Sequence, residues 1–196
     1  MGSVLQYVSQ ARASGFVSGA GIQRYTISHQ TPTTLVTGQT SWVATTPTFM
    51  IYKTATQISN RLILSNFTLE QDGTVAGAKI GIIGAIDTTN RYASGGTAVV
   101  PQLTSAQQVA SAVTPEFTFR TNPTATAAGS FNTIPRYFNL GSWLPVTGTT
   151  LPTCDCQDEF VIQGPGSILI YTFATGTGPS WNFTFEVIEE PVQGIL

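Results

Sequence analysis

Charged side chains are unusually scarce in this sequence. Its 196 residues include only eight lysines and arginines and ten aspartates and glutamates, or 9% of the chain, against about 25% in an ordinary soluble domain. Their place is taken by serine, glutamine, asparagine, glycine and 31 threonines. Because dispersed charge keeps copies of a soluble protein apart, such a surface suits a chain that is largely covered by neighbours in an assembly.

The scarcity of basic residues argues against two classes of partner. No two lysines or arginines are adjacent, and the formal net charge is -2. A nucleic-acid surface needs clustered lysine and arginine to displace counterions, and a peripheral membrane protein needs a polybasic patch. We therefore expect no nucleic-acid partner and no membrane partner.

Long apolar runs are also missing. The most apolar stretches, residues 78–86 and 168–174, are far shorter than the roughly 20 residues of a membrane-spanning helix. Residues 1–7 lack the charged and apolar regions of a secretory signal. We expect a protein made in the cytoplasm and not exported by the secretory route, although release by cell lysis stays open.

Cysteine and histidine are too few for the common metal sites. Cys154 and Cys156 are separated by one residue, and a disulfide across so short a loop would be strained. A zinc site takes four ligands, but the single histidine, His29, is remote in the sequence. We expect two reduced thiols, a surface histidine, no metal and no cofactor.

Catalytic motifs are absent from the sequence. There is no nucleophile elbow and no glycine-rich phosphate loop. Three groups of carboxylates, at 70–72, 155–159 and 186–190, have the residue type of a glycosidase pair but nothing further to mark them. Glu189 and Glu190 are expected to form a solvated strand end, or to pair with an arginine of a neighbouring molecule. We expect no enzymatic activity.

What the sequence does contain is a series of short β-prone segments separated by turn residues. The clearest are 48–53, 61–70, 78–87, 167–173 and 181–187, and weaker ones are 35–36, 97–101, 115–121, 137–140 and 159–163. Asp72–Gly73 favours a hairpin between the second and third segments, and Gly176–Pro179 favours another between 167–173 and 181–187.

The last of these segments has the most regular pattern. Its apolar side chains alternate with polar ones, which is typical of a half-buried antiparallel strand; they are Trp181, Phe183, Phe185 and Val187. Burial of each aromatic ring contributes roughly 2–3 kcal/mol. Segment 78–87 is instead apolar on both faces, as in a strand covered on both sides.

About eight to ten short strands without a long helix predict an all-β fold, a single antiparallel jelly-roll sandwich. We assign this sandwich to residues 46–196 and an extended arm to residues 1–45. The arm is rich in small residues, and its scattered apolar side chains are too few to fold alone. They are expected to contact a neighbouring subunit; those that we single out are Val4, Leu5, Tyr7, Val8 and Phe16.

Several segments resemble tailed-bacteriophage virion structural proteins, of the head decoration (cement) or fibre type, with a single tumour-necrosis-factor-like jelly roll. The segments are 46–52, 61–64, 86–97 with Pro101, 164–170, 181–186 and 189–191. The resemblance spans residues 46–191 as loose patterns, does not include the arm and carries no catalytic residues.

This resemblance implies a homotrimer on the capsid surface of a virion, with the major capsid protein as its partner. An apolar face formed by Ile80, Ile82 and Ile86 would then be buried along the threefold axis. The arm would link neighbouring subunits, and the protein would stabilise the head.

Two other functions remain open at this point. The same fold serves receptor- or carbohydrate-binding modules of head and tail fibres, where an exposed Trp143 would stack on a sugar. A single-jelly-roll capsid shell protein is the third alternative.

Overall fold

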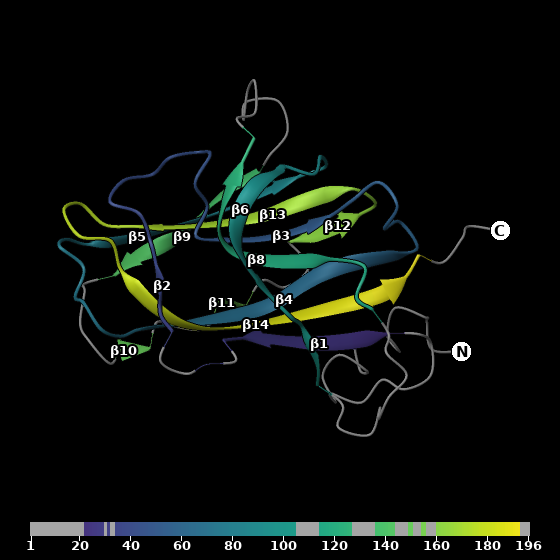
Figure 1. Ribbon diagram of the computed structural model, residues 1–196, viewed down its shortest axis with the longest axis horizontal. Helices are drawn as coiled ribbons and strands as arrows, with labels where there is room; N and C mark the ends of the chain where they lie inside the picture. The colour runs from purple at the N-terminus through teal and green to yellow at the C-terminus, as the bar shows by residue number, and fades with distance from the viewer. Residues whose placement is uncertain are drawn as a thin grey trace, which may run out of the picture.

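The chain forms two antiparallel sheets that pack face to face as a jelly-roll-like sandwich (Figure 1). The computed structural model describes residues 22–29, 31, 34–104, 114–126, 136–143, 149–150, 154–155 and 160–192. The predicted all-β sandwich is confirmed. The five apolar residues singled out in the arm, from Val4 to Phe16, lie outside the described residues.

The first sheet has eight strands, with β14 at its centre between β4 and β1. β7 pairs with β1, β2 with β14, and three short strands, β10, β11 and β12, pair with β4. The bounds are β1 (Gln23–Ser28), β2 (Val36–Thr37), β4 (Asn60–Gln71), β7 (Gln102–Leu103), β10 (Thr149–Thr150), β11 (Cys154–Asp155), β12 (Val161–Gln163) and β14 (Ser180–Pro191).

The second sheet has six strands in the order β6-β8-β3-β13-β5-β9. Figure 1 shows β13, β3 and β5 in one layer and β4, β14 and β1 in the other. The bounds are β3 (Phe49–Lys53), β5 (Ile80–Asp87), β6 (Tyr92–Val99), β8 (Thr118–Ala125), β9 (Arg136–Trp143) and β13 (Gly166–Phe173).

The alternation predicted for the last strand holds in the structure. Its apolar side chains face the second sheet, and Phe185, which is fully buried, is at the middle of an aromatic cluster. The ring of Phe185 lies 5.0–5.1 Å from the rings of Phe49, Phe67 and Phe119, measured between centroids. We call this group with Phe183 the central core.

Buried hydroxyl groups lie beside the central core and satisfy the one indole nitrogen there. Trp181 Nε1 donates to Thr172 Oγ1 at 2.8 Å. Thr172 Oγ1 in turn lies 2.9 Å from Thr48 Oγ1, and Thr48 Oγ1 accepts from the backbone N–H of Thr172 at 3.0 Å. A buried Trp N–H would be costly without such a partner.

Both predicted hairpins are wrong. β4 and β5 lie in different sheets, as do β13 and β14, so the turn residues between them carry the chain from one layer to the other. The two connections lie side by side, since Gly77 N donates to Thr177 O at 2.9 Å. A Cβ on Gly77 would lie only 2.7 Å from Thr175 O, so this approach requires glycine.

The predicted boundary at residue 45 needs correction. β1 pairs along its length with β14, and its Tyr25 and Ile27 side chains are buried in the core. β2 also pairs with β14, and the next residues bridge to the other sheet through Gln39 N, which donates to Thr172 O at 2.8 Å. Residues 22–29 and 34–39 therefore belong to the sandwich, because Tyr25, Ile27 and Val36 are buried in its interior, and residues 40–45 form the loop that leads into β3.

Candidate functional site

The second sheet carries a second apolar cluster on its outer face, opposite the central core. The side chains at alternate positions of β3, β5 and β13 point outward there, which confirms that segment 78–87 is apolar on both sides. The outer cluster consists of Met50, Tyr52, Ala85, Ala125, Leu169 and Tyr171, with Ile83 and Tyr92 packed against it.

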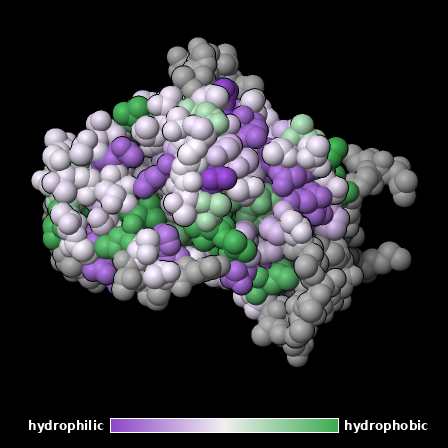
Figure 2. Space-filling model, in the orientation of Figure 1, coloured by the Kyte–Doolittle hydropathy of each residue, from purple (hydrophilic) through white to green (hydrophobic). Residues whose placement is uncertain are grey.

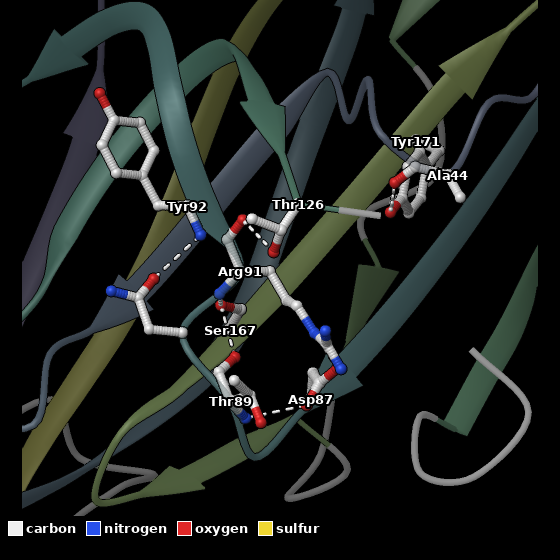
Figure 3. A network of polar contacts seen from close by, with 9 residues as sticks. Ala44, Asp87, Thr89, Arg91, Tyr92, Thr126, Ser167 and Tyr171 are labelled. Atoms are coloured by element: carbon white, nitrogen blue, oxygen red, sulfur yellow. Dashed lines mark hydrogen bonds and ion pairs between the residues drawn. The ribbon is translucent and has the colours of Figure 1, made fainter. Parts of the chain in front are cut away.

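The loop before β3 is attached to this outer cluster. Tyr171 Oη donates to Ala44 O at 2.9 Å, and Ala125 N donates to Thr45 O at 2.9 Å. Figure 3 shows the Tyr171 hydroxyl directed at Ala44. The same loop carries two adjacent exposed apolar side chains, Trp42 and Val43, each 42% exposed. The loop therefore presents an apolar tip from a fixed backbone.

A polar network fixes the connection between β5 and β6 at one end of this face (Figure 3). Arg91 Nε lies 2.6 Å from Asp87 Oδ2, and Asp87 Oδ1 accepts from Thr89 N at 2.8 Å. The buried hydroxyl of Ser167 donates to Thr89 O at 3.1 Å and accepts from Arg91 N at 2.8 Å. Arg91 O accepts from Thr126 N at 2.7 Å. All these groups are satisfied, so this network serves as a structural clamp.

Aromatic stacking extends the clamp along the sheet. The rings of Tyr52 and Tyr92 are parallel, with centroids 4.7 Å apart. The guanidinium of Arg120 lies 4.7 Å from the centre of the Tyr92 ring and donates to the carbonyls of Gly95 and Gly96. Tyr92 is thus covered by Tyr52 and Arg120, which leaves little of its ring for a ligand.

The residues predicted for a threefold axis do not face outward. Ile80 and Ile82 are 0% and 2% exposed within the sandwich interior, and Ile86 packs against the same core. The alternation of β5 directs these three inward. The prediction of a trimer core at Ile80, Ile82 and Ile86 is therefore corrected: these side chains are already buried within one chain.

Charged side chains are buried at one end of the sandwich interior. Lys53, the last residue of β3, is 0% exposed, and its Nζ lies 3.5 Å from Glu116 Oε2 and donates to Asn60 O. Glu116 Oε2 also accepts from Asn60 N at 2.9 Å. From the facing sheet, Glu189 of β14 is 1% exposed. We call Lys53, Glu116 and Glu189 the end cluster.

The end cluster has unusual proton affinities. Burial raises the pKa of Glu189 to about 7, and the charge of Glu116 adds to this, while the Glu116 backbone N–H, Lys53 and Tyr25 oppose it. Burial also lowers the pKa of Lys53, against the attraction of both carboxylates. For Glu116, burial is outweighed by hydrogen bonds from Asn60 and Ser59 and by Lys53, so that its pKa is lowered.

Glu189 and Glu190 are not the solvated strand end that the sequence suggested. Glu190 pairs with Arg61 of the same chain, and Glu189 lies inside. The alternation from Phe185 through Val187 reaches Glu189, and that from Phe49 through Ile51 reaches Lys53. Continuing both patterns by one step would have found the two buried charges.

The remaining candidate residues from the sequence are the histidine, Trp143 and the two cysteines. His29 is partly exposed: its ring lies 5.0 Å from that of Phe183, and its Nε2 atom is buried without a hydrogen-bond partner among the described residues. Burial lowers its pKa. Trp143 ends β9 and Cys154 begins β11, opposite Ile80 and Phe67, but their side chains and Cys156 lie outside the described residues.

Within the described part of the chain, no three histidine, cysteine, aspartate or glutamate side chains gather as metal ligands. No helix in that part is long and apolar enough to cross a membrane. Comparison with models of protein families, with curated proteins and with solved structures finds no match to this chain.

Proposed function

We propose that this chain is a non-enzymatic structural protein of a tailed-bacteriophage virion, a decoration or cement protein that binds the head and stabilises it. The observation that carries the proposal is the low charge of a folded, sandwich-forming chain, 9% of its residues. Figure 2 shows one face that is mostly pale, with small and separate hydrophobic and hydrophilic patches. A surface of this kind suits many modest contacts with a repeated partner.

The resemblance adds support because its segments have definite structural roles. Segment 86–97 contains Asp87, Thr89 and Arg91, which build the clamp between β5 and β6. Segments 164–170 and 181–186 fall in and next to β13 and in β14, the central strands of the two sheets. The resemblance is therefore one of fold.

The partners in this proposal are the major capsid protein and further copies of the chain, as a homotrimer on the capsid surface. The chain would be made in the host cytoplasm. Because β1 begins at Gln23, the segment proposed to link neighbouring subunits shortens from residues 1–45 to residues 1–21. The trimer interface is not the Ile80 face, since that face is internal.

A head-binding assay tests the proposal. Heads of the encoding phage that lack the protein are incubated with the full chain or with a variant lacking residues 1–21, and bound protein is measured after sedimentation. We expect saturable binding of the full chain and weaker binding of the variant. Removal of residues 1–45 is unsuitable because it deletes the core residues Tyr25 and Ile27. Failure of the full chain to bind heads would reject the proposal, and equal binding would reject only the role of residues 1–21.

A carbohydrate- or receptor-binding module is the second candidate, favoured by Trp42. This side chain is 42% exposed on a loop whose backbone is tied to Tyr171 and Ala125, and exposed aromatic rings stack on sugars. A glycan array probed with the full chain, Trp42→Ala and Val43→Ala tests it. Binding lost only with Trp42→Ala supports this function, and absence of glycan binding rejects it. Spontaneous assembly of the pure chain into closed shells would instead indicate a shell protein.

A further inference from the structure

The end cluster joins the two sheets through groups that do not balance in charge. It brings one ammonium group, Lys53, to two carboxylates, Glu116 and Glu189, at an end of the interior where Lys53 and Glu189 are 0% and 1% exposed. Lys53 lies 3.5 Å from Glu116, so the ammonium already has an ionic partner. Glu116 is partly exposed, whereas Glu189 is buried, so an ionised Glu189 would be an uncompensated charge in the interior, which is costly.

The hydrogen bonds to Glu189 leave part of its buried carboxyl group unsatisfied: the Glu116 backbone N–H donates to it and lowers its pKa, but burial outweighs this effect. Its Oε1 is buried and has no partner among the described residues. The Tyr25 hydroxyl, which also faces Glu189, donates to Gln23 Oε1. A tyrosine has a single hydroxyl hydrogen and cannot donate to both. A protonated Glu189 can itself donate to the tyrosine oxygen, which completes a chain of hydrogen bonds from Glu189 through Tyr25 to Gln23.

The charged and titratable groups that face Glu189 come from three packed elements. They are Tyr25 of β1, Lys53 of β3 and Glu116 of the segment before β8. The neighbouring strand β4 places Leu62 beside Glu189 in the register, and the adjacent Arg61 is paired with Glu190. Among the described residues, no second cation is therefore available to neutralise the Glu189 carboxylate.

We propose that the end cluster is a proton-dependent latch: Glu189 holds a proton while β1, β14 and the segment before β8 are packed together, and loss of that proton loosens this end of the sandwich. Opening of this end of the sandwich would hydrate the Glu189 carboxylate and separate Tyr25 from Phe117. The rings of these two residues pack edge to face in the closed state, with centroids 5.4 Å apart. The central core, made of apolar rings, would stay closed. This inference is independent of the proposed virion function.

The sign of the effect follows from linkage. The pKa of Glu189 is about 7 in the folded chain, above that of an unfolded glutamate, so the folded state binds the proton more tightly and is stabilised as pH falls from 8 towards 5. For a rise in the pKa of Glu189 of this size, the equilibrium constant for unfolding should be roughly 30-fold larger at pH 8 than at pH 5.5 through Glu189 alone. His29, with a lowered pKa, acts in the opposite direction below about pH 6.5.

Urea unfolding of the full chain between pH 5.5 and 8, compared with Glu189→Gln, isolates the contribution of Glu189, because His29 is present in both. We expect the roughly 30-fold pH dependence to disappear in Glu189→Gln and to persist in Glu190→Gln, the matched change on the opposite face of the strand. Amides of β1 and of the segment before β8 should also exchange faster at pH 8, after correction for intrinsic rates. The same pH dependence in the full chain and Glu189→Gln would overturn the proposal.

A second measurement covers the case in which Glu189→Gln does not fold. The carboxyl carbon of Glu189 is followed by NMR in the unaltered chain from pH 4 to 9. A titration midpoint near 7 supports the latch, and a midpoint at the ordinary value for glutamate, about 4.3, overturns it.

Discussion

Two facing strands, β3 and β14, each direct a row of side chains into the sandwich, and each row changes from aromatic to charged over a few residues. On β3 the row runs through Phe49 and Ile51 to Lys53, and on β14 it runs through Phe185 and Val187 to Glu189. At the central core, burial alone stabilises the contact between the sheets, and no charge is involved. At the end cluster, the contact depends on which groups are ionised.

Burial of a side chain and its contribution to stability are therefore separate properties of a position. Lys53 and Phe185 are both 0% exposed, but the environment of Phe185 is favourable at any pH, whereas that of Lys53 depends on Glu116 and Glu189. Removal of one member of a buried ion pair leaves the charge of the other member uncompensated. The experiments below test whether the two regions respond as differently as their chemistry requires.

The largest effect is expected at the centre, from Phe185→Ala. Removal of this ring from contact with four other phenylalanines should lower the free energy of unfolding by about 4 kcal/mol, equally at pH 5.5 and 8. Urea denaturation at both pH values measures it, with Thr184→Ala on the outer face of the same strand as the control, expected within about 0.5 kcal/mol. A loss of unfolding free energy that varies with pH would contradict the statement that no charge is involved at the central core.

The end cluster should respond to Lys53→Met with a loss of about 3 kcal/mol, because the buried Glu189 and the partly exposed Glu116 lose their cation. Adding Glu116→Gln to Lys53→Met should restore part of this loss, since it removes one of the uncompensated charges. The measurement is a double-mutant cycle by urea denaturation at pH 7. Simple additivity of the two changes would show that Lys53 and Glu116 are not coupled.

A smaller effect tests whether a buried, uncharged hydrogen bond beside the central core stabilises the chain independently of pH. Thr172→Val keeps the shape of the side chain but leaves Trp181 Nε1 without its acceptor at 2.8 Å. We expect a loss of about 2 kcal/mol, with no change in pH dependence. Thermal unfolding followed by tryptophan fluorescence measures it. An unchanged melting temperature would show that another group accepts from the indole.

The smallest effect is expected from His29→Asn. Because the pKa of His29 is lowered by burial, the folded state binds a proton less readily than the unfolded chain, and stability is lost as pH falls through about 6.5. Glu189 stabilises both chains as pH falls from 7 to 5.5, so the variant should gain more stability than the full chain over this range, as measured by urea denaturation. If the two chains respond equally to pH in this range, His29 is solvated in both states.

Much of the fold could be predicted from the sequence because strand alternation is a local signal. The inward positions of Trp181, Phe183 and Phe185 followed directly from it, as did the two apolar faces of segment 78–87. Both hairpins were wrong, because turn residues such as Asp72 and Gly73 show where a strand ends but not which sheet the next strand joins. The pairing of β4 with β14 in one sheet, and of β5 with β13 in the other, shows which sheet each strand joins.

The candidate site was less predictable. Glu189 and Lys53 look like solvated strand ends by residue type, although their register places them inside. Glu116 lies just before β8, and its approach to Lys53 depends on the pairing of β8 with β3, which the sequence does not show. The threefold axis at Ile80, Ile82 and Ile86 was wrong for a related reason: an apolar strand has two faces, and the sequence does not say which one faces the interior of its own chain.

We propose that this chain is a structural component of a virion, and quantitative mass spectrometry of purified particles of the phage that would then encode it tests this proposal most directly. We predict that the chain is present in a fixed, high ratio to the major capsid protein and that the ratio survives repeated density-gradient purification. A chain that is abundant in infected cells but absent from purified particles would contradict the account.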